Sequence, residues 1–436
     1  MRWTTWWHIV VVLQAARAHA EPTICDEGDC RCDSFTRVIC NCTRDNEIIL
    51  RPDGAYRVPS TATGIVVDGC SRVFFLPDTV RGLIRLRNVE LRNVRYVVIN
   101  QHALTWSPFS RESDMDPGIK IIIHNCTVNE IASHAIQGRV DDIIITNSRI
   151  NNIKPFAFSS LTGVKNIDLT GNVFDNIEIQ SFKKFTTMNF IFRGGYVHTL
   201  PSRFLSDVEV TNLFKMEGVT VNYIYSLTFL ICAPKRMLIE SNVIETLEGD
   251  SFHAVTRGAI TFRNNTIVNL NKGALLGFTV DRHVLSVMGP QELLMDNNTI
   301  TNLTPQSLTY NRSTLTMRID GLNINQTCSC ELVQEWSEVL KEQGGIITGW
   351  YPLEGHYVSL PTYKDSRCGA FKNNFWIFAV VGLVIILLVA AVIVFFIVRR
   401  ENEKKKLQIV MPDGKTYRET EFHIVVERAE LLTTDL

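Results

Sequence analysis

The chain has 436 residues, and its 44 Lys and Arg residues nearly balance 45 Asp and Glu residues, giving a formal net charge of -1 at pH 7. This balance produces no field of one sign over the whole molecule, which argues against nucleic acid as a partner recognised by bulk charge. No linker rich in Gly, Pro or Ser divides the middle of the chain into blocks, so we expect one long folded region there.

The N-terminus has the features of a secretory signal. Arg2 precedes an apolar stretch from Trp6 to Leu13, and Ala18 and Ala20 supply the small residues that a signal peptidase requires. The stretch is shorter than the about 20 apolar residues needed to span a bilayer. Residues 1–20 are therefore predicted to be a signal peptide cleaved after Ala20.

A second apolar run, residues 375–398, contains no charged residue and is long enough to cross a membrane as a helix. A basic cluster follows it, which places the C-terminal side in the cytoplasm by the positive-inside rule. The two segments together predict a single-pass type I protein of the plasma membrane with an extracellular N-terminus. Residues 369–374 form the juxtamembrane segment of this scheme, and residues 399–436 form its cytoplasmic tail.

N-glycosylation sequons occur before the predicted membrane span and are missing from the tail, which agrees with this topology. The candidate acceptors are Asn41, Asn125, Asn264, Asn297, Asn302, Asn311 and Asn325. Their crowding from Asn264 onwards predicts a heavily glycosylated C-terminal half of the ectodomain.

A recurring pattern of apolar residues runs through the ectodomain with a period of about 22 to 24 residues, which lies within the range of leucine-rich repeats. In its clearest copy, Ile167 and Leu169 alternate with polar residues and Asn172 follows. The alternation predicts a short strand with inward apolar side chains, and the Asn or Cys that follows can hydrogen-bond backbone groups left unpaired at the bend. Further copies begin at Ile84, Ile121, Ile143, Phe190, Phe214, Met237, Ile260, Leu293 and Leu315.

These repeats resemble the extracellular leucine-rich-repeat family, and pairs such as Ala157-Phe158 match the convex-side position of that family. The resemblance implies an α/β solenoid, a horseshoe with short parallel strands on its concave face. A right-handed parallel β-helix is the alternative fold, because its rungs have a similar period. The repeats are expected over residues 71–327, with residues 105–118 and 277–291 as loops or distorted repeats.

Cysteines flank the repeats where this family has its caps. Residues 21–70 would form the N-terminal cap and first repeat, and residues 328–368 the C-terminal cap. The fourth cysteine of the C-terminal cap is missing near Trp350 and Tyr351, which leaves either Cys328 or Cys330 without its usual partner. The disulfide candidates are Cys25, Cys30, Cys32, Cys40, Cys328, Cys330 and Cys368.

Two further cysteines fit the repeat itself. Cys70 and Cys126 occupy the position of the post-strand Asn, and we expect both to be buried and reduced rather than disulfide-bonded. Cys42 and Cys232 match no position of the pattern. The total of 11 cysteines is odd, which predicts a free or intermolecular thiol.

Side chains that alternate with the inward positions should face the concave surface. One predicted column mixes both signs of charge, and its neighbour contains aliphatic residues such as Ile191, Leu238 and Leu294. This mixture suits a protein ligand. The alternative is that glycan or a neighbouring subunit covers part of this surface. The candidate ligand-binding residues are Arg193, Glu217, Glu240, Arg263, Asp296 and Arg318.

Motifs of catalysis do not stand out in the sequence. It has no nucleophile elbow, no HExxH motif, no phosphate-binding glycine loop and no cysteine or histidine cluster with metal-ligand spacing. We therefore expect no enzyme activity, no cofactor and no metal. The alternative is an ectoenzyme on a β-helix that uses strand carboxylates to cleave glycans.

The predicted tail, of roughly forty residues, is too short for a signalling domain. Its end, with Thr434 and Leu436, resembles a class I ligand of a PDZ scaffold, which captures the terminal carboxylate. Glu427 with Leu431 and Leu432 resembles an acidic dileucine sorting signal, and the apolar side of a short helix explains the same leucines.

The sequence thus predicts a cell-surface receptor or adhesion molecule that binds an extracellular or cell-surface protein and is tethered to a scaffold inside the cell. A homo-oligomer is also compatible with it. The alternatives are a co-receptor or innate immune sensor that signals through a partner chain, and the glycan-cleaving ectoenzyme.

Overall fold

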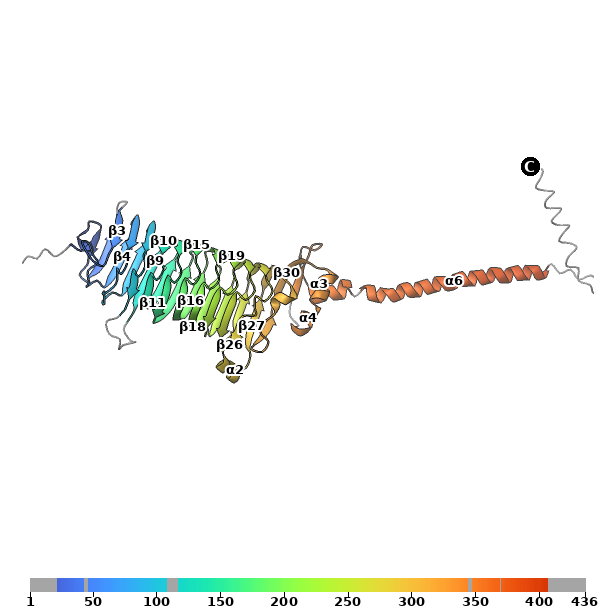
Figure 1. Cartoon of the computed structure of the whole chain (residues 1–436). Coiled ribbons are helices and arrows are strands. Elements are labelled where there is room, and N and C mark those ends of the chain that lie inside the picture. Colours follow the sequence, from blue (N-terminus) through green and yellow to red (C-terminus); the bar gives the residue numbers. More distant parts are fainter. Residues whose placement is uncertain (1–21, 43–45, 108–116, 344–346, 369, 407–436) are drawn as a thin grey trace, which may run out of the picture. The chain divides into compact units, whose positions relative to one another are not determined.

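The computed structural model describes residues 22–42, 46–107, 117–343, 347–368 and 370–406. The chain forms two compact units, Met1–Tyr363 and Lys364–Leu436. The first is a β-solenoid of about 12 turns with mostly parallel strands (Figure 1), which confirms the solenoid predicted from the repeat. The predicted signal peptide, PDZ ligand and sorting signal lie outside the described residues.

Each turn contributes strands to two sheets. Sheet I has 18 strands, and it bends so that the long strands β11, β16 and β18 run through both of its segments. The strands of sheet I are β1 (Cys30–Cys32), β2 (Arg37–Asn41), β4 (Gly64–Asp68), β6 (Asn88–Arg92), β8 (Leu104–Trp106), β9 (Ile119–His124), β11 (Ile136–Thr146), β13 (Phe158–Thr162), β14 (Val164–Thr170), β16 (Phe182–Arg193), β18 (Leu205–Glu217), β20 (Phe229–Cys232), β21 (Arg236–Glu240), β23 (Phe252–Thr256), β24 (Ile260–Arg263), β26 (Phe278–Val280), β27 (Gln291–Asp296) and β29 (Leu315–Ile319).

Sheet II has 14 strands, and all of its pairs are parallel except the last, between β31 and β32. The repeat pattern had predicted strands on one face only, so this second sheet is an addition to it. The strands of sheet II are β3 (Glu47–Leu50), β5 (Arg72–Phe75), β7 (Tyr96–Ile99), β10 (Thr127–Ile131), β12 (Arg149–Ile153), β15 (Val173–Ile177), β17 (Tyr196–Leu200), β19 (Thr220–Ile224), β22 (Val243–Leu247), β25 (Thr266–Leu270), β28 (Asn298–Asn302), β30 (Leu322–Thr327), β31 (Ile347–Tyr351) and β32 (His356–Ser359).

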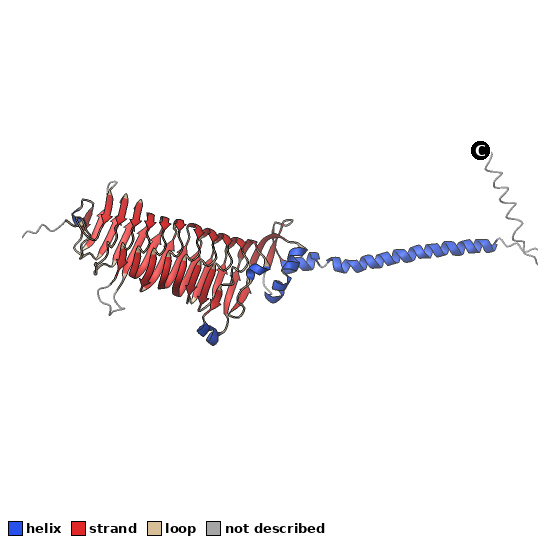
Figure 2. Cartoon of the chain, in the orientation of Figure 1, coloured by secondary structure: helices blue, strands red, loops and turns tan. Residues whose placement is uncertain are grey.

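Helices in the first unit are short, and they lie at the two ends of the stack of strands or beside it (Figure 2). They are η1 (Ile24–Asp26), α2 (Arg282–Met288), η2 (Pro305–Leu308), α3 (Cys330–Glu335), α4 (Ser337–Gln343) and α5 (Leu360–Tyr363). The second unit contains η3 (Lys364–Cys368) and α6 (Ala370–Lys406).

Equivalent positions of successive repeats pair in register, so an inward apolar side chain of one turn stacks on the inward apolar side chain of the next. Ile143 pairs with Ile167, Ile167 with Phe190, and Phe190 with Phe214. All four side chains are at most 1% exposed. Burying a side chain of this size contributes about 1.5–3 kcal/mol to the free energy of unfolding. Every turn makes this contribution again. The apolar positions read from the sequence therefore form one continuous core.

Phenylalanines stack along the other segment of sheet I. The rings of Phe158 and Phe182 lie 4.3 Å apart, and those of Phe229 and Phe252 lie 4.6 Å apart. Phe252 also stacks on Phe278 at 5.3 Å. These are the residues that follow Ala157 and its equivalents in the repeat, and they fill the core at the bend of the sheet.

Buried asparagines close the corner between sheet I and sheet II. Asn265 accepts a hydrogen bond from the Asn242 backbone N–H (3.0 Å) and donates one to the Ile239 carbonyl (2.8 Å). Asn298 makes the same pair of bonds to Asn265 and to the Phe262 carbonyl, one turn further on. Backbone groups left unpaired by the bend are thus satisfied by the next turn, as the sequence predicted.

The two interruptions of the repeat fall where the sequence placed them. Partners in adjacent turns are usually about 23 residues apart along the chain, whereas Arg263 and Asp296 are separated by 33. The extra residues form α2, which lies beside β26 at the edge of the solenoid (Figure 1). The other interruption separates Asn88 from its partner Lys120, and residues 108–116 of it lie outside the described part.

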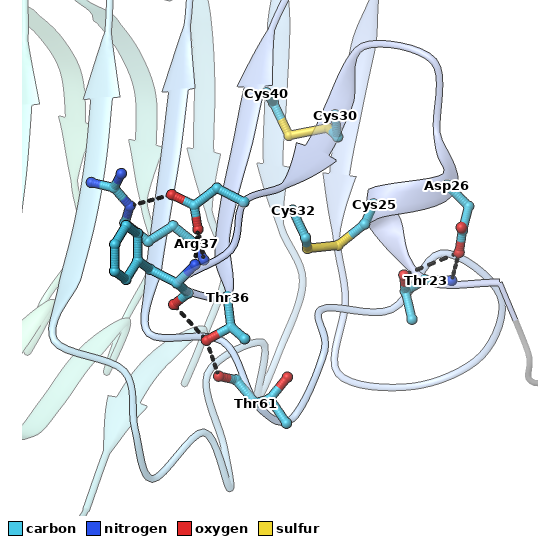
Figure 3. The surroundings of a disulfide bond; sticks show 11 residues. Thr23, Cys25, Asp26, Cys30, Cys32, Thr36, Arg37, Cys40 and Thr61 are labelled. Carbon is cyan, nitrogen blue, oxygen red and sulfur yellow. Dashed lines mark hydrogen bonds and ion pairs between the residues drawn. A yellow bond between two sulfur atoms is a disulfide. The ribbon is translucent and has the colours of Figure 1, made fainter.

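Disulfides hold the N-terminal cap. Cys25 bonds to Cys32, and Cys30 bonds to Cys40 across the antiparallel pair β1 and β2 (Figure 3). This antiparallel strand covers the first parallel turn, whose apolar interior would otherwise meet water. Figure 3 also shows Asp26 accepting hydrogen bonds from the backbone and hydroxyl of Thr23, which fix the entry of the chain.

Cys70 corrects one prediction. We expected a reduced thiol at this post-strand position, but Cys70 is bonded to Cys42. Cys42 follows β2 and Cys70 follows β4, and these strands are parallel neighbours, so both cysteines occupy the same corner in adjacent turns. Cys126 fulfils the expectation instead, since it is free and buried and its backbone N–H donates to Ser148 Oγ (3.0 Å).

Cys328 is the cysteine of the C-terminal cap that is left over. The sequence predicted that either Cys328 or Cys330 would lack its usual partner, and Cys328 is free and buried, whereas Cys330 and Cys368 are each disulfide-bonded. Its thiol packs against Gly349 of β31, where an added Cβ would come within 2.6 Å of the sulfur. The absence of a fourth cap cysteine near Trp350 therefore leaves Cys328 without a partner sulfur. The C-terminal cap is packed around the fully buried Trp336 instead.

The helix α6 contains a candidate membrane span, Trp376–Glu403, which is long and apolar enough to cross a membrane. It overlaps the run of residues 375–398 that was recognised in the sequence. Its large apolar side chains from Trp376 to Val398 are exposed within the second unit.

We predict that Asn265→Ala destabilises the solenoid by about 3 kcal/mol, because a buried backbone N–H and a buried carbonyl lose their partner together. Urea unfolding of the full chain in detergent, followed by tryptophan fluorescence, measures the change. Asn222→Ala is the matched control, since Asn222 bonds only to the exposed side chains of Tyr196 and His198. Equal effects of the two substitutions would contradict a structural role for the buried ladder.

Candidate protein-binding face

Five of the six predicted ligand-binding residues form a column on the outer surface of sheet I. Arg193 pairs in register with Glu217, Glu217 with Glu240, Glu240 with Arg263, and Arg263 with Asp296. We call these five residues the charge ladder. Each is the last residue of its strand, so the ladder follows the edge of the face along five turns.

Oppositely charged members of the ladder bond to one another. Arg193 Nε lies 2.6 Å from Glu217 Oε2, and Arg263 Nε lies 2.8 Å from Asp296 Oδ2. Arg263 also lies 3.8 Å from Glu240. Lys215, from the neighbouring column, lies 3.1 Å from Glu217 and 3.6 Å from Glu240. The ladder is therefore a connected ionic network.

The network contributes little to folding. About half of the Arg193 side chain and nearly half of the Arg263 side chain are exposed. Ion pairs in such positions typically contribute about 0–1 kcal/mol. Their geometry instead fixes charged groups at the surface in a defined pattern, which is the property that recognition needs.

Glu217 is held in its ionised form. Partial burial opposes ionisation, but hydrogen bonds from Lys215 and Arg193 and their positive charges outweigh it, so the pKa of Glu217 lies below its usual value. Any stability that this interaction provides is present above the unfolded pKa and is lost as the pH falls through the lower folded pKa. At neutral pH the carboxylate remains charged and available to a partner.

The last predicted member of the column lies elsewhere. Arg318 was aligned with Asp296, but it pairs in register with Leu294, one column away. The turn from β27 to β29 contains 24 residues, since Leu293 aligns with Met317, whereas the predicted alignment assumed 22. Arg318 instead binds Glu292 (3.2 Å) and Asp320 (2.9 Å). Leu294 is 8% exposed and therefore belongs to the core rather than to the face.

In the turns just before the ladder the same face is less charged. Ile122, Ile144 and Ile191 lie half-buried in the column beside the ladder, with Asp168 between them. His124 bonds to Thr146 at 2.9 Å in the ladder column. These less charged turns thus separate the ladder from a second group of charges, Asp68, Glu90 and Arg92, which occupy the same two columns on β4 and β6.

A corner of left-handed residues borders the ladder. The residue after each ladder position has a positive φ, and this corner is occupied by Gly194, Gly218, Ser241, Asn264 and Asn297 in successive turns. Glycine adopts this conformation with the least strain, and asparagine tolerates it better than most residues. Asn264 and Asn297 are exposed sequon residues, so glycans at these positions would line the C-terminal edge of the face.

The other sequons are spread over the unit. Asn125 occupies the same corner near the N-terminal end, and Asn41 is exposed at the end of β2. Asn302 and Asn325 are exposed on β28 and β30 of sheet II, and Asn311 is half-buried between η2 and β29. The sequon-free part of the solenoid therefore includes the middle turns of sheet I, where the ladder begins.

Cys232 matched no position of the repeat, and the structure places it as a free cysteine exposed at the end of β20. It borders an open hollow of about 640 Å³ that is also lined by Lys184, Asp207 and Glu209. Burial raises the pKa of the Cys126 thiol to about 11, and burial also raises the pKa values of Cys232 and Cys328. The three free thiols are thus distinguished by exposure.

Comparison of the sequence with protein-family models and with curated proteins gives no match.

We predict that maleimide at pH 8 modifies Cys232 in the folded chain and leaves Cys126 and Cys328 unmodified, because Cys232 is exposed and the other two thiols are buried. Peptide mass spectrometry of the labelled chain measures this, with urea-unfolded chain as the control in which all three react. Stoichiometric labelling of Cys126 in the folded chain would contradict its burial.

Proposed function

We propose that the chain is a single-pass type I glycoprotein of the plasma membrane, a receptor or adhesion molecule whose solenoid binds a protein ligand through the charge ladder. It would act by recognition and without catalysis, and its tail would bind a PDZ scaffold. The membrane assignment rests on α6, on the basic residues after it, and on the N-terminal signal pattern.

The observation that carries this proposal is the charge ladder itself. Both signs of charge occur over five turns and are oriented by one another before any partner arrives, which lowers the cost of ordering them on binding. A polyanion would favour a single positive patch, whereas a protein surface can match a mixed pattern. The aliphatic residues next to the ladder supply apolar contact area.

We assign the solenoid to the extracellular leucine-rich-repeat type. Three features support this: the buried asparagine ladder, the phenylalanine stack at the position after Ala157 and its equivalents, and the disulfide-bonded cap. A parallel β-helix with a glycan-cleaving site is the competing assignment. Such a site needs a carboxylic acid whose pKa is raised so that it can donate a proton. The pKa of Glu217 moves the other way, which favours binding at this part of the face.

The proposal predicts a saturable protein ligand. The full chain displayed on cells is screened against soluble ectodomains, including its own, and the triple variant Arg193→Ala, Glu240→Ala and Arg263→Ala should weaken binding at least about ten-fold, since central charged residues dominate such interfaces. Arg149→Ala is the control, because its ion pair with Asp175 (2.8 Å) lies on sheet II. Binding that survives the triple variant but not the control would place the ligand on sheet II.

The tail leads to a separate prediction. Leu436→Asp should abolish retrieval of PDZ scaffolds by a peptide of the last residues, because the pocket for the terminal side chain is apolar. Quantitative pull-down with the wild-type peptide and a Leu431→Asp control measures it. Retrieval that is unchanged by Leu436→Asp would rule out the PDZ assignment and would leave the receptor proposal untouched.

A further inference from the structure

We propose that the partner of the charge ladder is a second copy of this chain, bound face to face with the opposite turn order. This inference rests on the proposed binding role of sheet I and names its ligand. Its basis is a self-complementary order of charges that spans seven strands of the face.

The order of charges becomes clear when the turns are numbered from Glu240. Arg193 lies two turns before Glu240 and Asp296 lies two turns after it, while Glu217 and Arg263 lie one turn before and after. A two-fold axis parallel to β21 reverses the turn order but keeps each column over itself. It therefore sets Arg193 of one copy opposite Asp296 of the other, and Glu217 opposite Arg263.

The neighbouring column extends the match. Its exposed or half-buried members are Asp168, Ile191, Lys215, Leu238, Thr261 and Arg318, and the buried Leu294 occupies the strand between Thr261 and Arg318. The same axis passes through Leu238, which meets itself, and it sets Asp168 opposite Arg318. Each half of the pair thus gains three oppositely charged contacts, and an apolar residue lies at the centre.

Other positions of the axis match less well. An axis through Glu217 sets Lys215 opposite Lys215 and leaves one opposite-charge contact in each half of the ladder. An axis through Arg263 sets Glu240 opposite Asp296. With the axis at Glu240, like charges meet only on the axis, at Glu240 itself and at the exposed Arg236 in the next column of β21. The Glu240 carboxylate already lies within 4 Å of Lys215 and Arg263, which offset its charge.

At the corner beside the ladder, this register brings the following residues together. The axis sets Asn264 opposite Gly218 and Asn297 opposite Gly194, while Ser241 meets itself. Each sequon-bearing corner therefore faces a corner that has no side chain. Asparagine serves the same left-handed position in other turns, such as Asn147, so the backbone alone does not demand glycine at Gly194 and Gly218.

The area of the contact patch suits a weak interaction between two copies of the chain that are anchored in different membranes. Seven strands at about 4.8 Å spacing and five residues of about 3.3 Å each give roughly 500 Å² per copy. This is the low end for specific interfaces, and many copies on a cell surface would strengthen it by avidity. Because the two solenoids run in opposite directions, their C-terminal ends point apart, as required for copies anchored in two facing membranes.

Charge reversal in two separate cell populations tests the register. Cells that display full-length Arg263→Glu should not cluster with one another, and neither should cells that display Glu217→Arg, because each self-pair juxtaposes like charges. Mixing the two populations restores both contacts. The unchanged Glu217 of one variant faces the unchanged Arg263 of the other, and the introduced glutamate faces the introduced arginine. We expect clustering to fall at least about ten-fold in each variant alone and to recover in the mixture.

Cells that display Arg149→Glu control for the loss of a surface ion pair, and surface staining controls for delivery of each variant. Recovery in the mixture cannot come from contacts within one chain, so it would establish pairing between copies in this register. Wild-type cells that fail to cluster, or a mixture that stays dispersed with both variants at the surface, would overturn the proposal. If the screen described above still finds a different ectodomain ligand, the receptor function stands and only self-pairing fails.

Discussion

The solenoid depends on one constraint, which is that backbone groups exposed by each corner must find a partner inside the molecule. Asn172, Asn242, Asn265 and Asn298 meet it by bonding backwards to the previous turns. Because each side-chain amide bonds to the backbone of the turn before it, adjacent turns keep the same position relative to one another and their strands pair in register. The aligned core and the aligned surface columns both follow from this register.

Where the asparagine is replaced, the corner is closed by other means. Ser148 accepts from the backbone of Cys126 and donates to the Thr146 carbonyl, so a hydroxyl bridges the two turns. Cys70 is tied covalently to Cys42 near the N-terminal end of the solenoid. The irregular repeats of the sequence therefore reflect several chemical solutions to the same requirement.

Register has a second consequence at the surface, since it turns scattered charges into a pattern. Glu217 and Arg263 are far apart in the chain, yet each lies next to Glu240 in the ladder. The short distances among them fix the orientation of charged groups that would otherwise be mobile. A face that is ordered in this way can distinguish partners by the sequence of charges along it, whereas a uniformly charged face cannot.

Much of the fold could be predicted from the sequence because the signal is local and repeated. Inward residues such as Ile167, the corner asparagines and both interruptions were found by spacing, and the N-terminal cap cysteines by their resemblance to a known family. Errors arose where one turn differed from the rest. Arg318 was misplaced because its turn is longer than the predicted alignment assumed, and Cys70 was expected to be reduced although Cys42 occupies the same corner one turn earlier.

The sequence by itself determined which residues point inward, that the turns stack as a solenoid, and that an apolar segment long enough for a membrane follows them, since each depends on hydrophobic period and length. Tertiary structure alone decided the second sheet, the pairing of Cys42 with Cys70, the exposure of Cys232 and the ionic contacts of the ladder. These depend on which residues become neighbours across turns, and a difference of one or two residues in a turn changes every such neighbour.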